Sequence, residues 1–350
     1  MDSFGIKSIA DMLGASAAKL SGKTILWTGT GGFLGQGVIR LIKYLNENVL
    51  EERCRILAYD MRIPDEPVFS EFSNSGIVFR SHDLTTKLWP VGEPIDYVVH
   101  MAGIASPYHY KRRPLETIDV AIEGVRSTLE IARHHGAKFL FTSSSEVYQT
   151  ATVIPTPETY IGAIASNNER SCYDVSKLMG ENLSYVYHQN LGVHTNCIRI
   201  FNSFGPGILE SDSRILPRIA SAIVGGYPIS VFTNRSLPTR TYCPSGNTIA
   251  GMFLALLNGK SGEIYNIGVD SPELSVPDLV KRIETVCGLE VPHNLVEPES
   301  VYADEPLRRC PSIEKAKACL GYNPAISLED GLRLFFNWAL KTYKGVKPSN

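Results

Sequence analysis

The sequence lacks an excess of charge of either sign. Its 350 residues include 34 Lys and Arg against 36 Asp and Glu, which leaves a formal net charge of −2. Proteins that bind nucleic acid or an acidic membrane surface by electrostatics carry a clear surplus of basic residues. We therefore expect neither of these partners and look instead for a small-molecule ligand.

Cysteine pairs are also lacking. The seven cysteines are scattered singly, and no Cys-x-x-Cys pair occurs. This odd number and this spacing fit a reducing compartment better than a disulfide framework. They match no zinc-ligand spacing either, so no metal site is expected.

Long apolar runs are missing throughout, including the first 22 residues. Apolar positions there recur at helical intervals, but charged residues such as Asp11 and Lys19 interrupt them. The segment does not resemble a signal peptide, and no stretch approaches the length of a membrane span. We expect an N-terminal helix within 1–22, packed on the domain of a cytoplasmic protein.

A glycine-rich turn follows the first apolar run. Lys23–Trp27 reads as a strand, T-G-T-G-G-F-L-G follows at 28–35, and a helical pattern begins directly afterwards. Glycines in such a turn let the backbone approach a pyrophosphate at the positive end of a helix. Placed between a strand and a helix, the Gly-x-x-Gly-x-x-Gly pattern predicts a dinucleotide site. The predicted cofactor contacts of this turn are Gly29, Gly32, Phe33, Leu34 and Gly35.

Further cofactor contacts are predicted at the ends of the next strands. Arg55–Tyr59 leads to Asp60, whose carboxylate can accept hydrogen bonds from an adenosine ribose and repels a 2′-phosphate. NAD is therefore favoured, although Arg62 could partly offset the repulsion, which leaves NADP open. Asp83 could meet the adenine amino group or serve only as a turn residue. The other predicted contacts, after strands Ile77–Phe79 and Ile95–His100, are Leu84, Met101, Ala102 and Gly103.

Strands and helices alternate along most of the chain. Apolar runs at 138–142, 195–200 and 264–267 add three strands, separated by helical patterns. The alternation predicts an α/β fold, a Rossmann-like doubly wound parallel sheet. From Gly205 the elements become shorter and richer in Pro and Gly. We expect an NAD-binding domain over 23–204, to which 241–269 returns, and a smaller C-terminal substrate-binding portion over 205–240 and 270–350.

Tyr173 and Lys177 lie four residues apart, so both side chains of a helix can reach one small volume. By itself this pattern also suits a core tyrosine and a solvent-exposed lysine. A neighbouring ammonium would favour the phenolate and prepare it for proton transfer. Ser144 and Glu146, which could be a turn residue and a cap, follow strand 138–142 at the sheet's ligand-binding end. With the dinucleotide turn, the set predicts removal of a hydroxyl proton while hydride leaves the sugar carbon, with Tyr173 and Lys177 also contacting the cofactor.

These motifs resemble the extended short-chain dehydrogenases/reductases, the NAD-dependent epimerase/dehydratase superfamily of nucleotide-sugar enzymes. Within it the chain looks most like the UDP-glucuronate decarboxylases, or UDP-xylose synthases. The resemblance runs from about Lys23 to Leu340. Besides the turn, it rests on S-S-S-E-V-Y at 143–148, R-S-C-Y-D-V-S-K at 170–177, R-I-F-N-S-F-G-P at 199–206, D-S-R at 212–214, Y-N-I-G at 265–268, D-E-P-L-R-R-C-P-S-I-E-K-A-K at 304–317 and L-G-Y-N-P at 320–324.

The resemblance implies that NAD oxidises the sugar C4 hydroxyl, that the resulting β-keto acid loses carbon dioxide, and that hydride returns to C4. It implies that Tyr173 is the base, Lys177 its support and Ser144 the hydroxyl partner. Glu146 would lie near C5 and C6, and Arg309 near the decarboxylating carbon unless it forms only a structural salt bridge. A homodimer through helices near 115–134 and 174–190 is also implied. The implied substrate contacts are Ser145, Asn202, Arg214 and Arg240.

The sequence departs from the family pattern at four positions. Ala121 stands where an asparagine is usual, and Gln149 replaces a glycine. Pro244 and Asn247 replace an aromatic residue and an aspartate that would flank the sugar and nucleotide, which leaves the base and sugar preference open. A 4-epimerase or a 4,6-dehydratase would share the C4 oxidation, although Ser145 replaces the aspartate a dehydratase needs. A non-catalytic dinucleotide-binding or scaffold protein is the alternative from another class.

Overall fold

A seven-stranded sheet forms the centre of the protein. The computed structural model describes residues 4–63, 70–72, 74–88, 92–232, 238–296 and 307–346. The strands follow the order β11-β6-β5-β4-β1-β2-β3 and all pair in parallel. The predicted doubly wound, Rossmann-like α/β fold is therefore confirmed. The strands are β1 (Thr24–Thr28), β2 (Arg55–Asp60), β3 (Ile77–Ser81), β4 (Tyr97–His100), β5 (Lys138–Ser144), β6 (Thr195–Ile200) and β11 (Glu263–Ile267).

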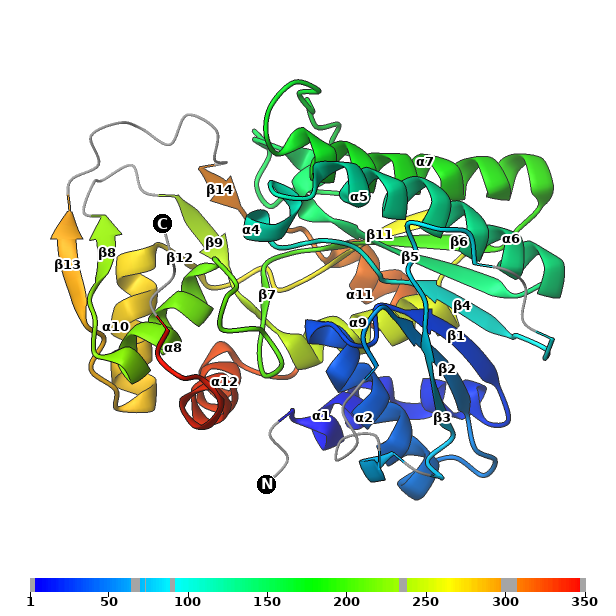
Figure 1. Ribbon diagram of the computed structural model, residues 1–350, viewed down its shortest axis with the longest axis horizontal. Coiled ribbons are helices and arrows are strands. Elements are labelled where there is room, and N and C mark those ends of the chain that lie inside the picture. Colours follow the sequence, from blue (N-terminus) through cyan, green and yellow to red (C-terminus); the bar gives the residue numbers. More distant parts are fainter. Residues whose placement is uncertain are drawn as a thin grey trace.

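Helices cover both faces of this sheet, as a parallel sheet with apolar strands requires. One face carries a core of strand side chains with α6 and α7, and the other a core with α1, α2, α9 and α11. Figure 1 shows α5, α6 and α7 on one side of the strands and α1, α2 and α9 on the other. The helices are α1 (Ile6–Leu13), α2 (Phe33–Asn48), α4 (Pro107–Tyr110), α5 (Pro114–Asp119), α6 (Val125–His135), α7 (Ser171–Leu191), α9 (Ser245–Asn258) and α11 (Glu314–Leu320).

The helix predicted over 115–134 is interrupted. Between α5 and α6 the chain forms a π-helical turn, η2 (Val120–Gly124). Ala121, the residue that replaces the usual asparagine, lies buried in this turn. Apolar periodicity cannot reveal such a local change of hydrogen-bonding register, because the residues on both sides keep a helical pattern.

The N-terminal segment packs on the sheet domain as expected. Helix α1 is followed by a 3-10 helix, η1 (Gly14–Leu20), and contacts α2 and α9. Ile9, Leu13 and Leu20 are fully buried. Among the described residues, no helix is both long enough and apolar enough to cross a membrane.

A second apolar core lies beside the sheet domain, around residues from α8, α10 and α12. Residues 313–326 pack instead on the core of the sheet. The proposed division into an NAD-binding domain and a substrate-binding portion remains a prediction. The elements after β6, apart from α9, β11 and α11, are β7 (Ser203–Phe204), α8 (Ile215–Gly225), β8 (Ile229–Phe232), β9 (Thr239–Thr241), β10 (Cys243–Pro244), β12 (Glu273–Leu274), α10 (Val276–Cys287), β13 (His293–Val296), β14 (Arg308–Arg309) and α12 (Leu328–Thr342).

Candidate active site

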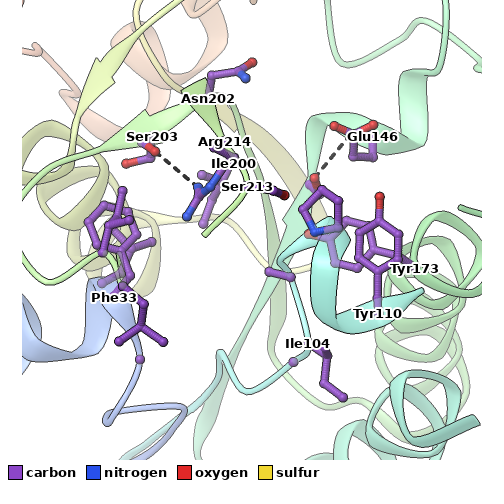
Figure 2. Close-up of a pocket in the computed structure, with 18 of the residues that line it drawn as sticks. Phe33, Ile104, Tyr110, Glu146, Tyr173, Ile200, Asn202, Ser203, Ser213 and Arg214 are labelled. Atoms are coloured by element: carbon purple, nitrogen blue, oxygen red, sulfur yellow. Dashed lines mark hydrogen bonds between the residues drawn. The ribbon is translucent and has the colours of Figure 1, made fainter. Parts of the chain in front are cut away.

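One cavity of about 1250 Å³ runs along the carboxyl ends of the central strands and reaches the second core. Ligands of open α/β sheets bind at this edge. Figure 2 shows Tyr110, Tyr173 and Glu146 on one side of the cavity, with Phe33, Ser203 and Arg214 on the opposite side. All of the predicted site residues except Gly35 line this cavity.

The glycine turn connects β1 to α2 and fits a dinucleotide. Gly29 has a φ of +80°, and a Cβ there would lie 2.7 Å from the backbone nitrogen of Ala102. Gly35 does not face the cavity; a Cβ there would collide with the carbonyl oxygens of Gly29 and Thr30. Gly32 precedes Phe33, the first residue of α2, so the helix N-terminus opens into the cavity. This arrangement suits a pyrophosphate, with Gly35 acting through close packing of turn and helix.

The two predicted adenosine-binding carboxylates already have backbone partners. Asp60 accepts hydrogen bonds from the backbone of Gly31 (2.9 Å) and Arg62 (3.1 Å) and so closes the turn. Asp83 accepts from the backbone nitrogen and hydroxyl of Thr85, at 3.0 and 2.9 Å. These bonds, the backbone bond first, lower the pKa of Asp83. Asp83 therefore does serve its own turn, while both carboxylates still line the cavity.

The other predicted cofactor contacts, at Leu84 and at the end of β4, lie on the same wall of the cavity. The backbone nitrogens of Met101 and Ala102 each donate to the Thr28 hydroxyl at 3.1 Å, which fixes the end of β4 against β1. Gly103 lies next to the lysine of α7, and a Cβ there would make only an ordinary contact, 3.6 Å from Lys177 Nζ. Leu84 completes this wall of the cavity.

Ser144, Tyr173 and Lys177 meet between β5 and α7. Lys177 Nζ donates to the carbonyl oxygen of Thr142 at 2.8 Å and lies 5.7 Å from the centre of the Tyr173 ring. Tyr110 of α4 stacks on Tyr173, with ring centres 5.2 Å apart and planes within 12°. The Tyr173 ring is thus fixed between two elements, with its hydroxyl near Ser144.

Burial dominates the acid–base properties of this centre. The sequence predicts that Lys177 lowers the pKa of the phenol, but burial instead raises the pKa of Tyr173 to about 12. The largest opposing effect is a hydrogen bond from Ser144. Burial also lowers the pKa of Lys177 to about 8. Both shifts favour the neutral form, because desolvation penalises charge.

Glu146 lies between two arginines, on the 3-10 turn η3 (Ser145–Tyr148). Its carboxylate forms ion pairs with Arg170, the N-cap residue of α7, and with Arg309 of β14. Burial alone would raise the pKa of Glu146, but the two guanidinium charges, Arg309 first, bring this pKa below its ordinary value. Arg309 does form the salt bridge that was the alternative to a role near the decarboxylating carbon, and its partner is Glu146, the residue predicted to lie near C5 and C6. The role of Arg309 toward the substrate stays a prediction.

Arg309 keeps one donor group unused. The residue is 6% exposed, and its Nη2 is buried without a hydrogen-bond partner among the described residues. A buried guanidinium nitrogen without an acceptor costs free energy, which a ligand carboxylate or phosphate would recover. This atom is therefore a donor that an anionic ligand group would satisfy, next to the Glu146 ion pair.

The predicted diphosphate-binding residues lie toward the second core. Arg214 holds both oxygens of Asp212, at 2.9 Å each, and donates to the Ser203 carbonyl at 3.4 Å. Asn202 has a buried Oδ1 without a hydrogen-bond partner in the part of the chain that the structure describes. Arg240 donates to the carbonyl of Thr239 at 2.8 Å. Together with Ser145, these residues line the cavity.

None of the four sequence departures lies on the lining of the cavity, and two of them were expected to flank the ligand. Asn247 is fully buried and pairs with the backbone of Ile326, donating at 2.8 Å and accepting at 3.0 Å. Pro244 is buried in β10 against Gly331. Neither residue lines the cavity, so the expectation that they flank the sugar and nucleotide is wrong.

Sequence reasoning missed three residues of this site. It gave no role to Arg170, Asp174 or Tyr110. Arg170 and Asp174 belong to the R-S-C-Y-D-V-S-K stretch. Arg170 lies about one helical turn before the predicted base Tyr173, and Asp174 directly follows it. Helical spacing could have indicated Arg170, whereas Tyr110 arrives from a short helix whose packing no motif records.

Comparison with known proteins agrees with this geometry. UDP-glucuronic acid decarboxylase 1 of Arabidopsis thaliana is 31% identical over 310 residues, 88% of this chain and 68% of the relative. The Xenopus tropicalis protein of the same name is 28% identical over 312 residues, 89% of this chain and 70% of the relative. A solved UDP-glucuronic acid 4-epimerase from Bacillus cereus, in complex with NAD, superposes with a TM-score of 0.74 at 26% identity, covering 93% of this chain and 98% of the other.

The family profile covers the parallel sheet and most of the site at its carboxyl edge, while Arg309 lies beyond it. It matches residues 25–268, from β1 through β11, and is described as the NAD dependent epimerase/dehydratase family. NAD is the cofactor of that family, and the glycine turn and Asp60 fit it. The chain belongs to the NAD-dependent epimerase/dehydratase family of enzymes.

Proposed function

We propose that this enzyme decarboxylates a nucleoside-diphosphate glucuronate, UDP-glucuronate or CDP-glucuronate, to the corresponding pentose. The observation that carries the proposal is Arg309, which is buried, lines the cavity and pairs with Glu146, with Nη2 lacking a partner among the described residues. A substrate carboxylate would supply the missing acceptor and a charge-assisted hydrogen bond. The relatives named above as UDP-glucuronic acid decarboxylases support this choice.

The first chemical step falls to the centre between β5 and α7. NAD, when bound, supplies the hydride acceptor and later returns the hydride. Tyr173 takes the proton of the C4 hydroxyl, and the Ser144 hydroxyl holds that oxygen in place. Lys177, a cation below its pKa of about 8, stabilises the phenolate. The product of this step is a 4-keto sugar.

The second step uses the cluster around Glu146. A ketone at C4 makes the C5 carboxylate a β-keto acid, so its carbon–carbon bond breaks with the electron pair passing into a C4 enolate and carbon dioxide leaving. A proton then adds at C5, and hydride returns to C4 as Tyr173 returns its proton to the oxygen. Glu146, fixed by two arginines, repels the substrate carboxylate toward neutral carbon dioxide, while Arg309 orients it.

Incubation with UDP- and CDP-glucuronate labelled in the carboxylate tests this proposal. We expect the label to leave as carbon dioxide and NMR to show a nucleotide pentose. A product that retains the label would contradict decarboxylation. The two nucleotides in parallel also determine the preferred base.

A 4-epimerase is the second candidate. The neighbour from Bacillus cereus is named a UDP-glucuronic acid 4-epimerase, so a uronate can also be inverted on this fold. An epimerase would turn the keto sugar over before hydride returns, and label would remain in the product. A 4,6-dehydratase fits less well because Ser145 cannot protonate a leaving hydroxyl as an aspartic acid would. Absence of turnover by wild type and by a Tyr173→Phe variant alike would favour a non-catalytic NAD-binding protein.

We further propose a homodimer. Helix α7 and the adjoining α5 and η2 expose large apolar side chains on one surface of the sheet domain. A second copy would cover them in a bundle of four helices, and a sedimentation mass of one chain would exclude this. These side chains are Leu115, Ile122, Leu178, Met179, Tyr185, Val186 and Leu191.

A cytoplasmic location also remains a proposal. The structure leaves all seven cysteines as free thiols, four of them buried. Free thiols suit a reducing compartment. Imaging of a fluorescent fusion of the full chain would test the location.

A further inference from the structure

Gln149 stands in a backbone conformation that glutamine rarely adopts. It caps the turn η3 with a φ of +51° and a ψ of −130°. Positive φ is unusual for a non-glycine residue and costs on the order of 1 kcal/mol or more. The Gln149 side chain is therefore expected to form interactions that offset this free-energy cost and that a glycine could not form.

The Gln149 side chain connects that turn to α7. Its Nε2 donates to Asp174 Oδ2 at 2.6 Å and to the Glu146 carbonyl oxygen at 3.1 Å. Its backbone nitrogen donates to the same carbonyl at 3.0 Å. The residue thus holds the turn that carries Glu146 against the residue that follows Tyr173.

Asp174 receives this bond in an almost closed environment. It is 1% exposed, and its Oδ1 is buried without a hydrogen-bond partner among the described residues. Burial, and then the Glu146 charge, raise the pKa of Asp174 to about 6, whereas the Gln149 bond and the charges of Arg170 and Arg309 act in the opposite direction. The phenols of Tyr110 and Tyr173 and the thiol of Cys172 also interact with Asp174.

Asp174 and Glu146 share one arginine. Arg170 forms an ion pair with Glu146 and lies 3.9 Å from Asp174 Oδ2 through its Nε. Ionised Asp174 therefore helps to hold Arg170, and Arg170 holds Glu146. Neither Gln149 nor Asp174 lines the cavity, so both act from behind the residues that face the substrate.

We propose that Gln149 and Asp174 are a positioning pair, which fixes the turn bearing Glu146 and thereby the Glu146–Arg309 ion pair relative to the Tyr173 hydroxyl. The inference rests on the proposed decarboxylation. Ser144 ends a central strand and Tyr173 lies on a long helix, so the oxidation centre is held by rigid elements. Glu146 lies on a single 3-10 turn and depends on the contact with α7.

Two variants remove the hydrogen bond between Gln149 and Asp174 and can still adopt the positive φ at position 149. Gln149→Gly adopts positive φ freely, and Gln149→Asn adopts it readily but is one methylene shorter. On mixing with UDP-glucuronate, we expect NADH formation within about twofold of wild type and carbon dioxide release about tenfold slower, since misplacement by a fraction of an ångström is enough. The acidic limb of the pH profile should move to higher pH, because Asp174 loses the donor that favours its ionised form.

Asn74→Gly is the matched control. Asn74 is also a non-glycine residue with positive φ, at +62°, but it is exposed and remote from the cavity. It should leave both rates and the pH profile unchanged. Equal losses of NADH formation and carbon dioxide release in the Gln149 variants, or an unmoved pH limb, would overturn the positioning role.

A double-mutant cycle separates this inference from the proposed reaction. Gln149→Asn, Asp174→Ala and the double variant are compared by thermal unfolding, which requires no turnover; alanine removes the acceptor of the Gln149 hydrogen bond. A melting-temperature shift of the double variant that differs from the sum of the single shifts supports the pair, whereas additive shifts reject it. Carbon dioxide release is judged in wild type alone, so its absence would refute the decarboxylase and leave the pair to be decided by the cycle.

Discussion

The two ends of the reacting centre manage charge in opposite ways. Around Tyr173 and Lys177, burial shifts both pKa values toward the neutral form. Around Glu146, two arginines hold a carboxylate ionised. A group that exchanges a proton must be able to adopt both its neutral and its charged form. A group that orients an anion must instead stay charged. The first end is built to move a proton, and the second to hold a charge still.

Removing the proton acceptor should have the largest effect. Tyr173→Phe is expected to lower turnover by about 10³-fold, within the range for loss of a general base. NAD binding, followed by fluorescence titration, should persist. Tyr110→Phe is the matched control, because it keeps the stacking on Tyr173 and should cost little. Both variants keep the two stacked rings, so comparable losses would mean that the Tyr173 hydroxyl is not the specific proton acceptor.

Removing the charge at the other end should separate the two steps. Arg309→Ala is expected to slow carbon dioxide release by about 10²-fold or more, since it removes the orienting cation and leaves a buried carboxylate with one partner. NADH formation after one mixing step should persist, seen by absorbance. The matched control is Arg308→Ala, whose side chain is 55% exposed and pairs with Glu273. Loss of NADH formation in Arg309→Ala would place Arg309 in the oxidation step and undo the contrast.

The proton-moving end was more accessible from sequence than the charge-holding end. Gly29, Ser144, Tyr173 and Lys177 lie in short motifs at the ends of β1 and β5 and on α7, and the carboxyl ends of parallel strands meet at one edge, so local spacing sufficed to place them on one cavity. The fold itself followed from the alternation of apolar strands and helices, and is confirmed.

The charge-holding end depends on contacts that no spacing encodes. The turn η3, helix α7 and strand β14 bring together Glu146, Arg170 and Arg309, whose sequence positions are far apart. The family resemblance indicated Glu146 and Arg309. It did not indicate the ion pair between them, or that Arg170 also pairs with Glu146. The same limit explains the error at Asn247, because tertiary packing assigned it to the Ile326 backbone.

A smaller change should tune the first end without destroying it. Ser144→Ala is expected to reduce turnover about 10- to 100-fold. The hydrogen bond from Ser144 lowers the pKa of Tyr173, so its loss raises that pKa. The rise in rate with pH that reports phenolate formation should then move to higher pH. An unmoved profile would show that Ser144 only orients the sugar.

The smallest expected effect is on stability and comes from Asp174, between the two ends. Its pKa is raised from 3.8 to about 6 in the folded protein, so folding favours the neutral acid. Below about pH 4 the group is neutral in both states and this shift has no consequence. As the pH rises through 6, the folded state must accept a disfavoured charge, which costs at most about 2 to 3 kcal/mol. Asp174→Asn should therefore melt higher than wild type at pH 8, with the difference shrinking toward pH 4.

Asp174→Asn also tests the contrast between the end of the site that exchanges a proton and the end that stays ionised. Its amide oxygen can still accept from Gln149, whereas it no longer attracts Arg170, so the gain in stability should come with slower carbon dioxide release. A variant that melts lower than wild type at pH 8 would show that the attraction between ionised Asp174 and Arg170 exceeds the free-energy cost of burying the Asp174 charge. In that case Asp174 would belong with Glu146 among the groups whose charge is held fixed, and the boundary between the two ends would lie between Tyr173 and Asp174, adjacent residues of one helix.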